Sequence, residues 1–159
     1  MTNPMALVGR ALAGRSVRYV LIGVSGVNLY AAVAGPGFIF VTQDYDLFLP
    51  PDPDNLVQAW AACEDAGLAL WSNDEPLDRP RDRWLAERVI AGRALTRMTG
   101  ASGLLVDITL VMKGYDFETV WKERRTFPGR PSRRTRAALQ TEGHQLANAP
   151  RSRYSPRAV

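Results

Sequence analysis

The chain has 159 residues, a net charge of +4 and 46% apolar residues, which is ordinary for one globular domain with a buried core. Cys63 is its only cysteine and His144 its only histidine. These counts exclude an intrachain disulfide, a zinc site built from cysteine and histidine, and a Ser-His-Asp or Cys-His catalytic system in the body of the chain. A reducing, cytoplasmic setting is the default expectation.

The positive charge is concentrated at the C-terminal end. The residues up to Arg125 carry slightly more acidic than basic groups, and the basic excess lies from Thr126 onward. Residues 128–159 have no hydrophobic periodicity and are rich in Arg, Pro, Ser and Ala. We therefore expect a folded domain over residues 1–127 and a basic, mostly disordered tail over residues 128–159. Two interpretations of this tail stay open: a natural basic segment that contacts nucleic acid or an acidic partner, and a C-terminal part altered by truncation or a change of frame.

Hydrophobic periodicity and turn residues predict alternating helices and strands. The apolar spacing and the caps, with Asp54 as the expected N-cap of the third helix, predict helices over 4–15, 25–34, 54–66, 82–90 and 117–125. Short apolar runs predict strands over 18–23, 38–49, 68–71, 93–98 and 104–112, the last two as a hairpin, and residues 73–81 read as a surface loop. This pattern indicates an α/β (α+β) fold with a mixed, mostly antiparallel sheet flanked by helices.

Residues 19–43 contain no charged side chain, and a segment of that length could span a bilayer. Glycines and a proline interrupt it, and its end meets Asp44 and Asp46 with no basic flank. A buried strand, a turn, a helix and a second strand explain these interruptions better, so we expect no membrane segment.

Asp44 and Asp46 are the most informative residues of the sequence. They alternate with Tyr45 and Leu47 in an apolar run, so on a strand both carboxylates project from one face. Like charges on one face repel, and partial burial increases the repulsion. A divalent cation between them would reverse the sign of that interaction, and Mg²⁺ favours carboxylate ligands together with substrate phosphates. The alternative is that both aspartates are turn residues exposed to water.

Asp107 is a third acidic residue in a strand-forming run, the only charge in Leu104–Val111. Alone it could lie at a solvated edge; together with the Asp44/Asp46 pair it offers the third ligand of a two-metal site. Upstream, Gly23 and Ser25 lie in a turn between a strand and a helix, where backbone N–H groups can bind an anion. Tight packing is an equally simple reason for glycine at this turn.

This order of motifs resembles the nucleotidyltransferase superfamily that includes DNA polymerase beta. The closer likeness is to small bacterial nucleotidyltransferases, including toxin–antitoxin relatives. In these, a segment like Val20–Gly23 leads to a Thr-x-Asp-x-Asp-Leu segment, which here is Thr42–Leu47, and Val106–Ile108 is similar to their third carboxylate strand. The likeness extends to the helix predicted after it and covers about residues 18–127.

The resemblance implies a nucleotidyltransferase-like fold and a set of roles. Asp44, Asp46 and Asp107 would be the catalytic residues and would bind two Mg²⁺ ions, with Asp107 also helping to deprotonate the acceptor hydroxyl. Gly23, Ser25 and Thr42 would bind the nucleoside triphosphate. The acceptor would be a hydroxyl on RNA, a protein or a small molecule.

Three departures from the family pattern bear on activity. The glycine turn reads Gly23-Val24-Ser25-Gly26, the distance from it to Asp44 is long, and Phe40 stands where many relatives have an arginine. A basic group for the triphosphate would then come from elsewhere, with Lys113, Arg124 and Arg125 as candidates. An alternative function follows: a catalytically decayed nucleotidyltransferase-like protein that acts as a toxin–antitoxin or other binding partner. A third possibility is nucleic-acid binding through the tail alone.

Overall fold

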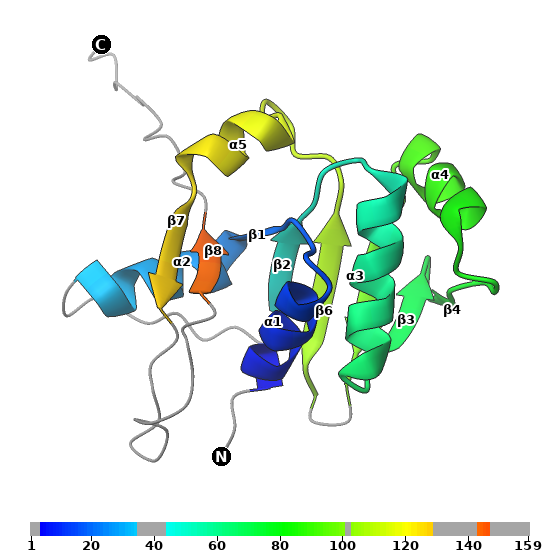
Figure 1. The fold of residues 1–159 in the computed structure, drawn as a ribbon, viewed down its shortest axis with the longest axis horizontal. Coiled ribbons are helices and arrows are strands. Elements are labelled where there is room, and N and C mark those ends of the chain that lie inside the picture. The colour runs from blue at the N-terminus through cyan, green and yellow to red at the C-terminus, as the bar shows by residue number, and fades with distance from the viewer. Residues whose placement is uncertain (1–3, 35–43, 101–102, 129–142, 147–159) are drawn as a thin grey trace, which may run out of the picture.

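The computed structural model describes residues 4–34, 44–100, 103–128 and 143–146 (Figure 1). Its helices are α1 (Pro4–Gly14), α2 (Gly23–Ala34), α3 (Pro53–Asp65), α4 (Arg83–Ala91) and α5 (Phe117–Glu123). Its strands are β1 (Val20–Ile22), β2 (Asp44–Phe48), β3 (Ala69–Ser72), β4 (Glu75–Pro76), β5 (Thr96–Thr99), β6 (Leu105–Thr109), β7 (Arg125–Pro128) and β8 (Gly143–Leu146).

The strands form one mixed sheet in the order β4-β3-β5-β6-β2-β1-β8-β7. The β1–β8 and β2–β6 pairs are parallel and the other pairs are antiparallel. The predicted α+β class with a mostly antiparallel sheet is therefore confirmed, and so is the β5–β6 hairpin. The parallel β2–β6 pair places two segments far apart in sequence side by side at the centre of the sheet (Figure 1).

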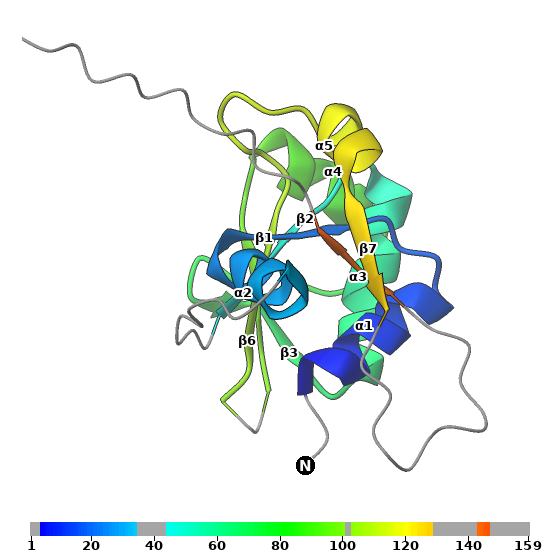
Figure 2. The ribbon, with the colours of Figure 1, turned by 90° about the vertical axis from the view of Figure 1, so that its left-hand side faces the viewer.

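One face of the sheet carries the main core. Leu47 of β2 and Ile108 of β6 are fully buried there, against α1 and α3. In α3 the apolar positions recur at helical spacing, so Leu56, Trp60 and Cys63 all point into this core. Figure 2 shows α1 and α3 together on one side of the central strands.

The opposite face has a smaller apolar cluster near α5. Val20 and Phe48 alternate with the residues of the main core, so they point to the other side of the sheet. They pack against Phe117 and Val120 of α5, with the rings of Phe48 and Phe117 edge to face at 5.4 Å. Asp44, Asp46 and Asp107 lie on this same face.

Several expected boundaries differ from the structure. Helix α3 is capped by Asp52, whose carboxylate accepts the N–H groups of Asp54 and Asn55, so the expected Asp54 cap is wrong. Pro53 fits the first helical position, which needs no N–H. The expected loop 73–81 contains the short strand β4, paired with β3.

The sheet also extends beyond the expected domain end at residue 127. Strand β8 lies within the expected tail, where it pairs with β1 at Leu21 and Leu146 and with β7 along Arg125–Pro128. The rest of that tail lies outside the described residues, as do residues 38–43 of the expected second strand. Among the helices that the structure describes, none is long and apolar enough to cross a membrane.

Candidate functional site

The turn from β1 into α2 gives the site its first wall. Gly23 has φ +68, a left-handed conformation that glycine adopts without steric strain. A Cβ added there would lie 2.5 Å from Oδ2 of Asp46. Any side chain at position 23 would therefore collide with the Asp46 carboxylate.

Strand β2 carries the two aspartates on one face. Asp44 is exposed and Asp46 is partly buried, whereas Leu47, on the opposite face, is fully buried. Asp46 pairs with Ile22 in the antiparallel β1–β2 ladder, one residue before the glycine turn. The alternation expected from the sequence is thus present, and it brings Asp46 to the turn.

Asp107 joins this face from the neighbouring strand. In the parallel β2–β6 register Asp46 lies opposite Asp107, and residues directly opposite on neighbouring strands project to the same side. The side chain of Asp107 is 12% exposed. Asp46 and Asp107 are adjacent across two strands, and Asp44 follows two residues along β2.

The carboxylates influence one another electrostatically. Burial, followed by the negative charges of Asp107 and Asp44, raises the pKa of Asp46, while the positive charge of Arg97 acts in the opposite direction. Ionised Asp46 is therefore destabilised by its own surroundings. A cation near these groups would relieve that destabilisation.

Arg97 is the residue of this site that the sequence did not reveal. It lies on β5 directly opposite Asp107, and its Nε and Nη2 donate to Oδ1 and Oδ2 of Asp107, both at 2.8 Å. The predicted hairpin contained the signal, because antiparallel pairing around the turn at Gly100–Leu104 sets Arg97 opposite Asp107.

The residues predicted to bind nucleotide have different outcomes. Gly23 lies at the site, next to Asp46. The Ser25 hydroxyl is buried and donates to the backbone oxygen of Asp44 at 2.6 Å, which fixes α2 to β2. Thr42 lies outside the described residues. In the structure the Ser25 hydroxyl holds α2 against β2. Its role in binding a phosphate stays a prediction.

The structure places Arg124 and Arg125, two of the basic groups suggested for the triphosphate, away from the three aspartates. The guanidinium of Arg124 lies 3.6 Å from the centre of the Trp121 ring and donates to the Trp121 carbonyl oxygen. Arg125 begins β7, at the far edge of the sheet from Arg97. The cationic side chain of Arg97 contacts Asp107 directly.

The donor set suits Mg²⁺ in chemistry, since it consists of carboxylate oxygens beside a glycine turn. In the part of the chain that the structure describes, no three His, Cys, Asp or Glu side chains are grouped closely enough to hold a metal ion. The carboxylate of Asp107 is paired with Arg97 through both of its oxygens. The three aspartates thus share a face, and a metal ligand role for Asp107 requires that its pair with Arg97 opens.

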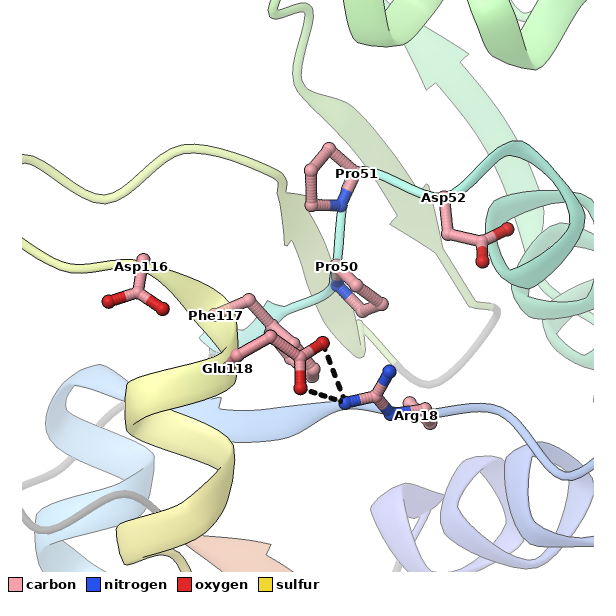
Figure 3. Close-up of a pocket in the computed structure, with 7 residues that line it drawn as sticks. All are labelled: Arg18, Pro50, Pro51, Asp52, Asp116, Phe117 and Glu118. Carbon is pink, nitrogen blue, oxygen red and sulfur yellow. Dashed lines mark hydrogen bonds and ion pairs between the residues drawn. The ribbon is translucent and has the colours of Figure 1, made fainter.

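A separate open pocket of about 380 Å³ lies beyond the C-terminal end of β2 (Figure 3). Nη2 of Arg18 donates to both carboxylate oxygens of Glu118, at 2.9 and 2.8 Å. Two further carboxylates at the pocket, those of Asp52 and Asp116, accept backbone N–H groups at the starts of α3 and α5. The lining residues are Arg18, Pro50, Pro51, Asp52, Asp116, Phe117 and Glu118. Asp44, Asp46 and Asp107 are not among these lining residues.

Comparisons of the chain with protein-family models, with curated proteins and with solved structures found no match.

Proposed function

We propose that this protein is a magnesium-dependent nucleotidyltransferase, which transfers a nucleoside monophosphate from a nucleoside triphosphate to a hydroxyl acceptor. The observation that carries the proposal is the in-register pairing of Asp46 with Asp107, beside the glycine turn that leads from β1 into α2. Carboxylates from two strands, next to a glycine that begins a helix, suit a triphosphate with its metal ions. The acceptor is a hydroxyl on RNA, a protein or a small molecule, and we assign the reaction to the cytoplasm.

In this proposal each residue has a chemical task. Asp44, Asp46 and Asp107 would hold two Mg²⁺ ions, which when bound supply charge stabilisation at the attacking and leaving oxygens. Asp107 accepts the proton of the acceptor hydroxyl at a carboxylate oxygen. The hydroxyl oxygen then bonds to the α-phosphorus, and the bond from that phosphorus to the departing pyrophosphate breaks. Backbone N–H groups at the start of α2, which begins at Gly23, would bind the phosphate chain.

A transfer assay tests this directly. The protein is incubated with labelled nucleoside triphosphates, Mg²⁺ and candidate acceptors, and the label on the acceptor is measured. Asp46→Asn should lower transfer by at least about a hundredfold, as does the loss of one group that stabilises transition-state charge in other enzymes. Asp65→Asn is the matched control, because Asp65 is an exposed aspartate that pairs with Arg15 away from the site. Equal transfer by the parent and Asp46→Asn would refute the proposal.

A second candidate is a catalytically decayed relative that acts as a toxin–antitoxin or other binding partner. Two observations favour it: Arg97 neutralises Asp107, and the Ser25 hydroxyl is used within the fold. Calorimetry separates the two candidates, because a decayed site shows no metal-dependent binding of a nucleoside triphosphate. Such binding together with label transfer would exclude the decayed alternative.

A further inference from the structure

Arg97 and Asp107 form an ion pair whose two side chains differ in their exposure to solvent. The Arg97 side chain is 44% exposed, whereas that of Asp107 is 12% exposed. The guanidinium can therefore move into solvent without much rearrangement, but the carboxylate is fixed within the sheet. When the pair opens, Arg97 is the partner that moves.

The pair is part of a row across the sheet. Arg97, Asp107 and Asp46 lie directly opposite one another on β5, β6 and β2, and Ile22 continues the row on β1 beside Gly23. Their side chains share one face, so the guanidinium lies on the same surface as all three aspartates. Arg97 thus places a positive charge on this acidic surface.

A guanidinium and a divalent cation would compete for the carboxylate of Asp107. Both carboxylate oxygens of Asp107 accept from Arg97, and two positive groups on one carboxylate repel each other. A phosphate chain offers the guanidinium an alternative, because planar guanidinium groups bind phosphate oxygens in the two-bond geometry that they use for carboxylates. The triphosphate can therefore take Arg97 from Asp107 while a metal ion takes its place.

We propose that Arg97 is a positioning residue that occupies Asp107 in the absence of substrate and transfers to the nucleoside triphosphate when it binds. Metal and nucleotide then enter the site together. This inference rests on the proposed function, because it takes the three aspartates to be metal ligands. It explains how a strand residue opposite the third carboxylate can both neutralise that carboxylate and serve the substrate.

The test is Mn²⁺ binding, measured by electron paramagnetic resonance on the full chain without nucleotide. Arg97→Gln removes the competitor and should bind Mn²⁺ about tenfold more tightly than the parent, the factor that corresponds to one hydrogen bond between charged groups. Arg83→Gln is the matched control, because Arg83 pairs with Asp54 and Glu87 on the surface, and its affinity for Mn²⁺ should stay unchanged. The double variant Arg97→Gln/Asp107→Asn should lose the gain.

A second measurement adds a non-hydrolysable nucleoside triphosphate. In the parent the nucleotide should raise the affinity for Mn²⁺ more than it does in Arg97→Gln, since only the parent has a pair to open. Arg97→Lys keeps the charge but not the paired geometry, so a smaller gain without nucleotide is expected. It also provides the test if Arg97→Gln does not fold, as judged by circular dichroism.

The outcomes separate this inference from the function on which it rests. If the parent binds Mn²⁺ with nucleotide and the folded Arg97 variants gain no affinity without it, Arg97 does not compete for Asp107 and the inference fails alone. If the parent binds no Mn²⁺ with or without nucleotide, and neither does Arg97→Gln, both the inference and the proposed function fail. Tighter binding that persists in the double variant would also overturn the inference, because the metal would then not use Asp107.

Discussion

Asp46 and Asp107 lie directly opposite each other on the neighbouring parallel strands β2 and β6, with their carboxylates on the same face of the sheet. Two acidic side chains in this arrangement repel each other, and the partial burial of Asp46 adds to that effect. Arg97 offsets part of the repulsion through its pair with Asp107. Charge repulsion that the fold offsets only in part is typical of functional sites, where activity can require groups that lower the stability of the folded state.

Replacement of Asp46 should stabilise the protein when no metal is present. The pKa of Asp46 is raised, so its ionised form, which dominates above that pKa, is disfavoured in the folded state, and the stability linked to its protonated form is lost as the pH rises. Asp46→Asn removes this charge. At neutral pH in a chelator, its melting temperature should equal or exceed that of the parent, as measured by circular dichroism. With Mg²⁺ and a nucleoside triphosphate the order should reverse, because only the parent gains stability from the ligand. A lower melting temperature for Asp46→Asn in both conditions would contradict the electrostatic account.

Gly23→Ala should damage the site more than its effect on stability suggests. The new Cβ would lie 2.5 Å from Asp46 Oδ2, and a short movement of that carboxylate relieves the clash. Gly67→Ala is the matched control, since Gly67 also has a positive φ, of +82, but has no atom within 4 Å of an added Cβ. Both variants should lose about 1–2 kcal/mol of unfolding free energy through backbone strain.

Only Gly23→Ala should also lose metal-dependent nucleotide binding, because it displaces Asp46. Urea denaturation measures the shared loss of stability, and calorimetry measures the difference in binding. Equal nucleotide binding by the two variants would show that the turn at Gly23 has no part in the site.

Much of this arrangement could be predicted from the sequence, and the physical reasons are clear. The alternation of Asp44 and Asp46 with apolar residues sets their common face, because side chains alternate along any strand. The glycine turn before α2 is also a local feature. Pairing between strands far apart in the chain is not local, so the sequence offered Asp107 only as a candidate; the β2–β6 register places it opposite Asp46.

Arg97 and Ser25 show what local reasoning misses. Arg97 occurs in a segment expected to be a strand, and its neighbours in the sequence do not indicate a role for a charged side chain there. Its role becomes visible only through the β5–β6 register. Ser25 was expected at an anion site. In the structure α2 lies close to β2, and the Ser25 hydroxyl donates to the Asp44 carbonyl oxygen. Strand β8 could not be predicted either, because it forms through pairing with β1 and β7 and has no local sequence pattern of a strand.

Thr96→Val should destabilise the main core although it replaces a side chain of similar shape. Thr96 and Trp60 are both fully buried, and Nε1 of Trp60 donates to Oγ1 of Thr96 at 3.3 Å. Valine would leave the indole N–H without this acceptor, at a cost of about 1–3 kcal/mol. Thr96→Ser keeps the hydroxyl and loses a methyl group, so a smaller loss of about 1 kcal/mol is expected. Urea denaturation compares the variants, and a Thr96→Val protein as stable as the parent would show that the hydrogen bond contributes nothing.

The thiol of Cys63 should be unreactive in the folded protein. Burial in the α3 core, with a smaller contribution from Glu64, raises the pKa of Cys63 from 9.0 to about 12. The reactive thiolate is therefore scarce at pH 8, and the side chain is also inaccessible. A thiol reagent monitored by absorbance should react rapidly in guanidinium and very slowly in buffer, with Cys63→Ala as the blank. Because the folded-state pKa is raised, the associated stability is present below pH 9 and is lost as the pH rises toward 12. Rapid labelling of the folded parent at pH 8 would contradict this packing.

In the proposed function, the face of the sheet that carries Asp44, Asp46 and Asp107 binds a nucleoside triphosphate through divalent metal ions. Isothermal titration calorimetry with a non-hydrolysable triphosphate, in Mg²⁺ and in chelator, measures this binding. We expect binding by the parent in Mg²⁺, no measurable binding in chelator, and at least about a tenfold loss of affinity in Asp46→Asn, equivalent to about 1.4 kcal/mol. Binding of equal strength with and without Mg²⁺, or unchanged by Asp46→Asn, would contradict the claim.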